Sequence, residues 1–276
     1  MILALAAGGL VVTATMGLMV LIARRRFISH LDALDAELRE PDGIRETRAD
    51  LPADVVALAT RMGARVVDAP AFVAIEQSGQ MWQKPGGKPV AFTARQTIRV
   101  GTPGFLWRAT MGSVVVADHL VAGIGGLDVM LLGAFPLARM IGSAAVNRGE
   151  ALRYLAELPW CPDAILSNTS LDWTVLDAKT IEVATGTGTA RGTVTFELDD
   201  DGWIVRASAP SRAYAEASGR TSEHPWHGRF WDYQRIGDHF MPMHGEVAWG
   251  LPAGDFVYWR GRLLDSAARD HDRAPH

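Results

Sequence analysis

The sequence contains a single cysteine, Cys161, and no excess of basic residues. One cysteine cannot form a disulfide within the chain, and a zinc site built from thiolates lacks its ligands. With 27 Lys and Arg against 31 Asp and Glu, the formal charge of −4 makes nucleic acid a poor partner. Hydrophobic residues make up 48% of the chain, which is enough for a large buried core.

Recognisable catalytic and metal-binding motifs are also missing. The chain has no serine nucleophile elbow and no H-E-x-x-H pattern. The C-terminal third does hold four histidines, namely His224, His227, His239 and His244. Residues three or five apart on a strand point to opposite faces, so neither His224 and His227 nor His239 and His244 form a natural ligand pair. We therefore predict no metal site, no cofactor and no catalytic residue.

One long apolar segment lies at the N-terminus. Residues 1–23 carry no charged side chain, and at about 1.5 Å per residue a helix of this length crosses the hydrocarbon layer of about 30 Å. Secretory signals place positive charge before the apolar run, whereas here Arg24, Arg25 and Arg26 follow it. We predict a single-pass transmembrane helix. The arginines favour a cytoplasmic soluble domain by the positive-inside rule, and an extracytoplasmic domain is the alternative.

The same segment offers a surface for a second helix. Gly9, Thr13 and Gly17 are spaced four apart, so they form a stripe of small residues along one helix face. Such a stripe fits a helix–helix partner in the membrane. The alternative is a set of ordinary small residues that face lipid.

A juxtamembrane helical neck is predicted at residues 24–63. Apolar residues recur there at helical spacing with charges between them, which indicates an amphipathic helix close to the membrane. These residues are Phe27, Leu31, Leu34 and Leu38. A second short helix fits residues 51–63, which carry Pro52 in the first turn and end with Gly63.

The period of the hydrophobic pattern changes to two from Phe72, which is the spacing of strands with one buried face. Residues 91–100 and 105–111 alternate around the turn "GTPG" and are predicted to form a hairpin. Short connections rich in Gly, Asp and Pro join most later runs, so we expect mainly antiparallel pairing. The further predicted strands are 113–122, 127–132, 171–176, 180–185, 193–198, 203–208, 226–236, 240–249 and 256–264.

One strong helix interrupts the strands at residues 148–158. Asn147 and Glu150 have the spacing of a capping box, and Pro159 ends the helix. About a dozen strands with one central helix favour a mainly β fold, in which a large curved antiparallel sheet, or half-barrel, wraps the helix. We assign residues 64–265 to this domain and residues 266–276 to a flexible tail.

The end of this helix is predicted to be structural. Trp160 is expected to plug the helix end into the sheet, and Cys161 to be a small buried filler. Glu157 lies four residues after Arg153, so the two pair on the helix surface. Alternatively, Glu157 points into the sheet.

Two further charged residues are candidates for a site. Asp118 shares the predicted buried face of its strand, and burying an unpaired carboxylate costs several kcal/mol, so it needs a partner. It is either part of a structural ion pair or strand-end hydrogen bond, or a polar anchor in an apolar cavity. Arg212 lies in the predicted loop "APSRAYAEASG" and fits the charged head group of a ligand, or it is simply an exposed arginine.

Most of the nine tryptophans lie in the predicted strands. Core packing is the default for them, because a strongly curved sheet needs bulky side chains to fill it. If the helix does not fill the concave face, the same residues would line a pocket for an apolar ligand. The tryptophans in predicted strands are Trp107, Trp173, Trp203, Trp226, Trp231, Trp249 and Trp259.

Two short motifs carry a resemblance to a known family. The pattern P-G-F-x-W-x-A is matched by Pro103, Gly104, Phe105, Trp107 and Ala109, and the pattern E-x-x-W-x-P by Glu157, Trp160 and Pro162. Over about residues 50–265 the chain resembles an uncharacterised bacterial family, a domain of unknown function with an N-terminal membrane segment. The resemblance implies a location in the bacterial inner membrane and brings no activity. Cys161 falls at a variable position of the second motif, so the resemblance gives no support for a catalytic thiol.

The late segment "WDYQRIGDHFMPMHGEVAWG" is similar to a second group, the lipoprotein-localisation factors. In their half-barrels a curved antiparallel sheet encloses helices and holds acyl chains. The resemblance implies binding of a hydrophobic ligand. Those carriers act outside the inner membrane, whereas Arg24, Arg25 and Arg26 favour a cytoplasmic domain here.

Our first functional hypothesis is a membrane-anchored half-barrel that binds a lipid or another hydrophobic small molecule in its concave face. The alternatives are an enzyme that uses Asp118 and Glu157 as acid and base, and a structural or assembly partner in the membrane. The candidate ligand-binding residues are Phe105, Trp107, Asp118, Glu157, Trp160, Trp173, Arg212 and Trp249.

Overall fold

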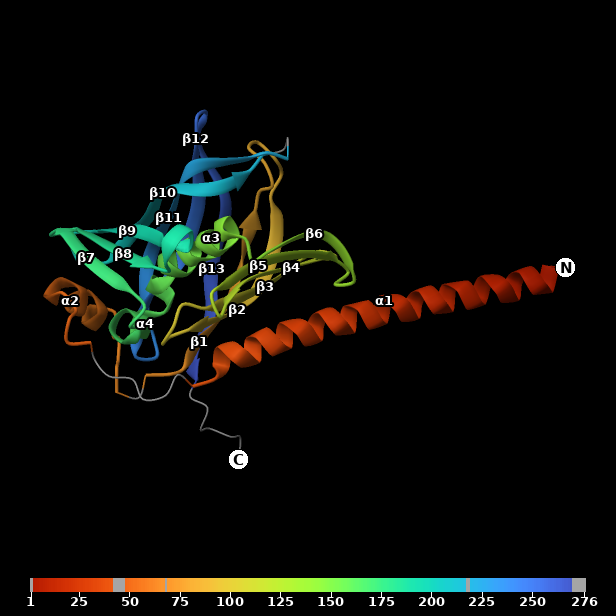
Figure 1. The fold of residues 1–276 in the computed structure, drawn as a ribbon, viewed down its shortest axis with the longest axis horizontal. Helices are drawn as coiled ribbons and strands as arrows, with labels where there is room; N and C mark the ends of the chain where they lie inside the picture. Colours follow the sequence, from red (N-terminus) through yellow and green to blue (C-terminus); the bar gives the residue numbers. More distant parts are fainter. Residues whose placement is uncertain (1, 42–47, 68, 217–218, 270–276) are drawn as a thin grey trace.

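The computed structural model describes the backbone of residues 2–41, 48–67, 69–216 and 219–269, and the side chains among these from residue 15 to residue 264. Its centre is one antiparallel sheet of thirteen strands that curls into a half-barrel (Figure 1). The predicted mainly β fold with a curved sheet around a helix is therefore confirmed. The strands are β1 (Phe72–Met81), β2 (Val90–Arg99), β3 (Phe105–Met111), β4 (Val114–Val121), β5 (Ile124–Leu131), β6 (Phe135–Ile141), β7 (Asp172–Asp177), β8 (Thr180–Thr185), β9 (Gly192–Leu198), β10 (Ile204–Ala215), β11 (Thr221–Ile236), β12 (His239–Leu251) and β13 (Gly254–Arg269).

The sheet has two arms that meet at its centre. The first arm runs outward from β1 to β6, and the second returns from β7 to β13, where β13 pairs with β1. Tight hairpins connect neighbouring strands of each arm. In the two-residue loop between β4 and β5, Ala122 and Gly123 both have positive φ (49° and 77°), which matches the right-handed twist of the strands.

One strand of the first arm, β6, is absent from the strands predicted by pattern. Its sequence "FPLARMI" lacks a period of two and contains Pro136. It forms nevertheless because it is an edge strand, where a missing N–H removes no ladder bond on the open side. At the other end of the chain, β13 continues to Arg269, so the first residues assigned to a flexible tail pair with β1. Residues 270–276 lie outside the described residues.

The connection between the arms crosses the concave face as α3 (Ala144–Ala156), a 3₁₀ turn η1 (Leu158–Trp160) and α4 (Pro162–Ser167). The helix α3 begins four residues before the predicted start, with the Ser143 hydroxyl accepting from the Val146 N–H at 3.2 Å. The predicted capping box is therefore wrong. The Asn147 side chain instead accepts from the Gly125 N–H at 2.8 Å and ties the helix to β5.

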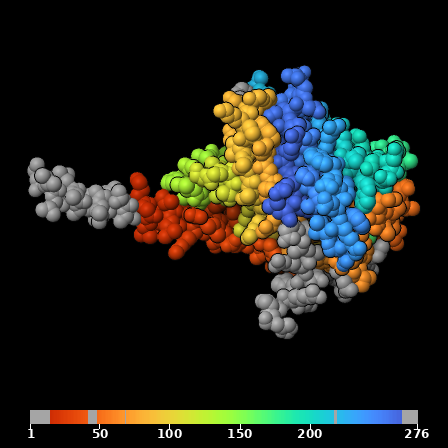
Figure 2. Space-filling model, turned by 180° about the vertical axis from the view of Figure 1, so that it is seen from behind, coloured from red at the N-terminus to blue at the C-terminus, as the bar shows by residue number. Residues whose placement is uncertain are grey.

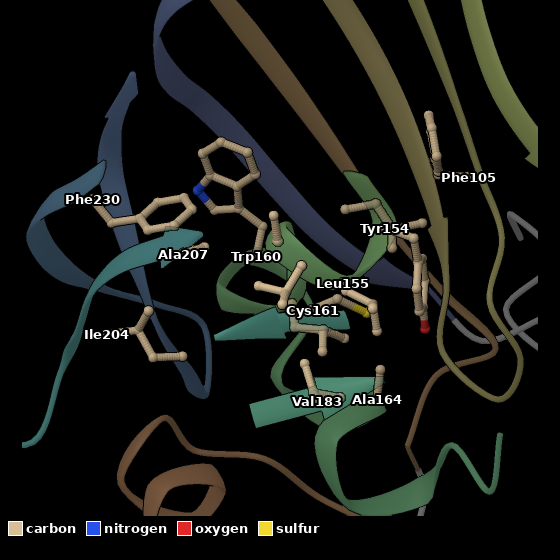
Figure 3. Close-up of a cluster of buried hydrophobic side chains, with 14 of the residues drawn as sticks. Phe105, Tyr154, Leu155, Trp160, Cys161, Ala164, Val183, Ile204, Ala207 and Phe230 are labelled. Carbon is tan, nitrogen blue, oxygen red and sulfur yellow. The ribbon is translucent and has the colours of Figure 1, made fainter. Parts of the chain in front are cut away.

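The core lies where α3, η1 and α4 pack between the two arms (Figure 3). Trp160 points toward Phe230 of β11, with ring centroids 5.5 Å apart, and its indole N–H donates to the Pro242 carbonyl at 2.9 Å. Cys161 is fully buried beneath it. The expectations of a tryptophan plug and a small buried cysteine are confirmed.

The helix α1 (Ile2–Arg39) is continuous and packs with its C-terminal half on the convex face of β2, β3 and β4. Phe27, Leu31 and Leu38 are buried there, so the predicted amphipathic face is confirmed, and the surface that covers it is the sheet. The Asp32 carboxylate accepts from Arg108 at 2.7 Å, and Asp35 accepts from the Thr97 hydroxyl at 2.6 Å. From this contact α1 projects away from the domain (Figures 1 and 2).

The second predicted helix of the neck is α2 (Ala53–Arg61), which packs against α4 and β7 at the far side of the domain. Its connection is fixed by Asp163, which accepts from the Arg65 N–H at 2.7 Å and contacts His239 Nε2 at 2.9 Å. Residues 24–63 thus hold two helices that contact opposite parts of the sheet.

The predicted transmembrane helix at residues 1–23 falls largely on residues 1–14, whose side chains lie outside the described residues. The same holds for Gly9 and Thr13 of the predicted helix–helix stripe. In the described part of the chain, no helix has the length and apolar character needed to cross a membrane.

Candidate functional site: a cavity between helix α3 and the sheet

A cavity of about 800 Å³ remains between α3 and the concave face of the sheet. Eight aromatic residues line it, from inward-facing positions of β3, β10, β11, β12 and β13 and from the η1 turn. The aromatic lining residues are Trp107, Trp160, Tyr214, Trp226, Phe230, Trp249, Tyr258 and Trp259. The helix therefore does not fill the concave face. The second interpretation, a pocket lining, applies to four of the seven tryptophans in predicted strands, and Trp160 of the η1 turn lines the cavity as well.

Several of the residues that face the cavity from α3 and from the strands opposite are small, which leaves space between the larger side chains. Ala145, Gly149 and Ala156 line it from the helix, and Gly228 and Gly245 line it from β11 and β12. A side chain added at Gly245 would come within 3.3 Å of the Trp160 ring, so this glycine lets the ring lie against the sheet.

A buried charge cluster lies at one end of the cavity. Arg153 of α3 forms an ion pair with Asp118 of β4 and donates to Glu157 Oε1 at 2.9 Å. The second Glu157 oxygen accepts from the Gln96 amide. Asp118 and Glu157 thus both contact the guanidinium of Arg153. Glu157 pairs with Arg153 and also points into the sheet, so its two predicted alternatives are both true.

The Arg153 guanidinium also lies over two rings, 4.9 Å from the Phe105 centroid and 5.1 Å from the Trp107 centroid. Burial lowers the pKa of Arg153, but the carboxylates of Glu157 and Asp118 outweigh it and hold this pKa above its ordinary value. Arg153 therefore remains a cation inside the domain.

A second charged pair, Arg212 and Glu150, lies on the cavity wall. Arg212 Nη2 is 3.7 Å from Glu150 Oε1, and the Arg212 guanidinium lies 4.6 Å from the centroid of the Trp226 ring and 5.8 Å from that of Trp249. Arg212 belongs to strand β10, where it pairs with His224 of β11, so the predicted loop is wrong. Its side chain is only 11% exposed, so the alternative of an exposed arginine is wrong as well. An arginine stacked on two indoles is a preorganised cationic group.

Glu150 has an unusual acidity. Burial raises the pKa of Glu150 well above its ordinary value, the Asp118 charge adds to this effect, and the Arg212 charge opposes it. Asp118 Oδ1 and Glu150 Oε2 are buried and accept no hydrogen bond from an N–H or hydroxyl group of the described residues. A proton shared between the two carboxyl groups, or a hydroxyl donor of a ligand, fits these oxygens.

The structure brings six of the eight predicted residues to the cavity wall: Trp107, Asp118, Glu157, Trp160, Arg212 and Trp249. It does not place the other two there. Phe105 is buried under the Arg153 guanidinium, and Trp173 packs on Phe196 in the second arm with centroids 6.4 Å apart. A tryptophan's place in a predicted strand does not show whether its side chain lies beside α3, at the cavity, or in another part of the sheet.

Sequence reasoning missed Glu150 and Arg153 as cavity residues. The helix pattern predicts Glu150 as a cap and Arg153 as a surface partner, because a single helix pattern does not show that both arms of the sheet enclose the helix. The signal was available in the spacing: Glu150, Arg153 and Glu157 share one face of a helix otherwise predicted to be central.

The acid–base hypothesis requires Asp118 and Glu157 to converge in one cleft. The two carboxylates do converge, because both contact the guanidinium of Arg153. Each is already bonded to that guanidinium. Within the described residues, no group of three or more His, Cys, Asp and Glu side chains is arranged to hold a metal ion. The arrangement is thus one of fixed charges in an apolar cavity.

Three solved structures are similar to this chain at low sequence identity. A LolA superfamily protein from Nitrosomonas europaea is 11% identical over 78% of this chain and 94% of that one, with a TM-score of 0.46. A DUF1329 family protein from Desulfovibrio piger is 13% identical over 80% of this chain and 93% of that one, with a TM-score of 0.46. A putative outer membrane lipoprotein-sorting protein domain from Vibrio parahaemolyticus is 8% identical over 80% of this chain and 93% of that one, with a TM-score of 0.44.

Comparison with curated proteins yields no match. The sequence of residues 44–261, by contrast, matches a described family along most of the chain. The expectation of an uncharacterised family is confirmed at that level, while the two short motifs and the N-terminal membrane segment remain predictions. The chain belongs to DUF6544, a family of unknown function.

Proposed function

We propose that this protein binds a lipid or another hydrophobic small molecule in the cavity between α3 and the sheet. The observation that carries the proposal is the aromatic-lined space of about 800 Å³ that remains after the central helix has packed. Ligand pockets typically enclose about 300–1,000 Å³ and combine apolar walls with a few convergent polar groups. This cavity has both features.

The polar groups define the kind of ligand. The rings of Trp107, Trp226 and Trp249 form the apolar wall, while Arg212 supplies a buried cation and Glu150 a carboxyl group with raised pKa. A ligand with a long apolar part and one polar or anionic end group satisfies both. Removal of apolar surface from water contributes about 25 cal/mol per Å², and the polar end fixes the orientation.

The proposal places the binding domain, residues 64–265, next to a bilayer. Residues 1–23 would anchor the chain in a bacterial inner membrane as a single pass, with Arg24, Arg25 and Arg26 at the lipid surface. Support comes from α1, which is one continuous helix from Ile2 to Arg39. Its C-terminal half packs on the sheet and therefore holds the domain close to the apolar N-terminal half. A cytoplasmic domain is proposed from the arginines, and a periplasmic one is the alternative that a protease-accessibility assay on spheroplasts distinguishes.

The test is native mass spectrometry of the full chain extracted from membranes in mild detergent. We expect a co-purifying hydrophobic molecule on the wild type and on Gly149→Ala, whose added methyl group lies at ordinary contact distance, 3.6 Å, from Arg212 Nε. The variant Gly149→Leu projects more bulk into the same space and should lose the ligand while the fold, measured by circular dichroism, is kept. Wild-type protein without any bound hydrophobic molecule, or equal loading of all three, would reject the proposal.

A further inference from the structure

The edge strand β6 exposes an apolar surface. All seven residues from Phe135 to Ile141 are exposed, and Leu137 has 57% of its side-chain surface open. Natural edge strands are usually protected by charge, by shortness or by a covering element. Here Arg139 is the one charged residue of the strand, and it pairs with Asp128 at 3.2 Å. An apolar edge of this kind indicates a partner surface.

The loop that leads into β6 adds to this surface. Leu132 lies at φ 56° and is half exposed, at a position of the loop where glycine, asparagine or aspartate is favoured. A leucine in the left-handed region of φ and ψ destabilises the fold through backbone strain, and an exposed leucine does not offset this cost by burying its side chain. The strain therefore points to a role for this side chain outside the folded domain.

The tip of the β5–β6 hairpin lies beside α1 at the point where its apolar segment meets the arginines. Gly133 is so close to Arg24 that a side chain at the glycine would meet Arg24 Cγ at 3.4 Å. The front and back views both show β6 next to this part of α1, which runs on past the hairpin (Figures 1 and 2). Beyond Arg24, α1 exposes further apolar side chains, namely Met16, Leu18, Met19, Leu21 and Ile22. The apolar surfaces of helix and hairpin are thus continuous.

The other end of β6 reaches the cavity. Met140 and Ile141 are about half exposed and also line the cavity, together with Leu127 of β5 and Ser143 at the start of α3. One strand therefore connects the α1 junction to the cavity wall through apolar side chains.

We propose that the β5–β6 hairpin is a second bilayer contact, which inserts Leu132, Phe135 and Leu137 among the lipid head groups beside α1. The occupant of this surface is the lipid bilayer: the surface continues the apolar segment of α1, and Arg24, Arg25 and Arg26 at the same level complement anionic head groups. Apolar ligands pass between bilayer and cavity along β6, over Met140 and Ile141. This passage rests on the proposed binding function, whereas the insertion of the hairpin rests only on the proposed membrane anchor at the start of α1.

Insertion is tested with the full chain reconstituted in vesicles of phosphatidylethanolamine and phosphatidylglycerol. An environment-sensitive fluorophore is attached to Leu137→Cys and, as the matched control, to Leu176→Cys on the opposite edge strand β7, where Leu176 is equally exposed. The native Cys161 is buried and does not compete for the label. Brominated lipids should quench the fluorophore at position 137 several-fold more than at position 176. Equal quenching at both positions would overturn the proposal.

Passage is tested with Leu137→Asp, with Leu176→Asp as control. We expect Leu137→Asp to slow the transfer of a fluorescent fatty acid from vesicles to the protein several-fold, while its equilibrium binding of the same probe in solution is unchanged. Unchanged transfer would overturn the passage. Absence of probe binding by the wild type would instead reject the proposed function and leave the quenching result standing. If Leu137→Asp converts a dimer into a monomer by light scattering, the edge pairs with a second copy and the bilayer assignment is wrong.

Discussion

Arg153 on α3 forms a buried ion pair with Asp118 on β4, and this pair joins the central helix to one arm of the sheet. The side chains are 16% and 14% exposed, so both charges are largely removed from water. Glu157 and the Phe105 and Trp107 rings complete the surroundings of the guanidinium. The pair therefore holds α3 at the distance from β4 at which the cavity exists.

Removing one partner of this pair should destabilise the fold. We expect Asp118→Ala to lower the free energy of unfolding by about 3 kcal/mol, at the low end of the cost of breaking a buried pair, because Glu157 still contacts Arg153. The control is Asp172→Ala, which removes an exposed partner of Arg191 at 2.8 Å and should cost less than about 1 kcal/mol. Denaturant unfolding in detergent measures both. A loss for Asp118→Ala no larger than that of the control would contradict the role of the pair.

Glu150 should make stability depend on pH. Its pKa in the folded state is raised above the ordinary value of 4.5 by burial first and by Asp118 second. In the interval above 4.5 the folded state then binds more protons than the unfolded state, so the free energy of unfolding falls as pH rises. The favourable contribution is complete below the unfolded pKa and is lost through the folded pKa.

The variant Glu150→Gln cannot titrate at this position. We expect its stability to decline less than that of the wild type between about pH 5 and pH 8. Buried histidines such as His119 and His227 titrate in both proteins, so their effect cancels when the two curves of unfolding free energy against pH are subtracted. Parallel curves would show that Glu150 keeps an ordinary pKa.

Arg212 should contribute to the binding of ligands with an anionic end. A hydrogen bond between a buried guanidinium and a carboxylate contributes about 1.5–3 kcal/mol, so Arg212→Ala is expected to weaken binding of a fluorescent fatty acid by about tenfold or more. Arg229→Ala on the same sheet is the control, because Arg229 is exposed. Equal affinities for the two variants would show that Arg212 serves packing alone.

Gly149 separates helix stability from cavity volume. Replacing a helix-interior glycine by alanine stabilises a helix by about 0.5–1 kcal/mol, and the space beside Gly149 accepts a methyl group. We therefore expect Gly149→Ala to raise the midpoint of thermal unfolding without loss of probe binding. A lower midpoint would mean that the glycine is needed for close packing.

Much of the fold could be predicted because its signals are local. The alternation in residues 91–111 predicts the β2–β3 hairpin, and the same rule places Asp118 on the inner face of β4. Tight turns with glycine mark most of the hairpins. The end of α3 also follows from sequence, since Pro159 cannot continue an α-helix and lies in the η1 turn directly after it.

The remainder depends on contacts between distant residues. The pairing of β1 with β13 joins Phe72 to Arg269, and no local pattern specifies it. The edge strand β6 has no alternation because neither of its faces is fully covered. The roles of Glu150 and Arg153 depend on which part of α3 faces open space, which is a property of the assembled arms.

The central claim, that the cavity holds an apolar ligand, is tested most directly by energy transfer from its tryptophans to a bound dansyl-labelled fatty acid. Trp107, Trp160, Trp226, Trp249 and Trp259 all line the cavity, so a bound probe lies within their reach. We predict saturable transfer with one site per chain in the wild type and in Gly149→Ala, and its loss in folded Gly149→Leu. Transfer that is absent from the wild type, or that remains unchanged in Gly149→Leu, would contradict the account.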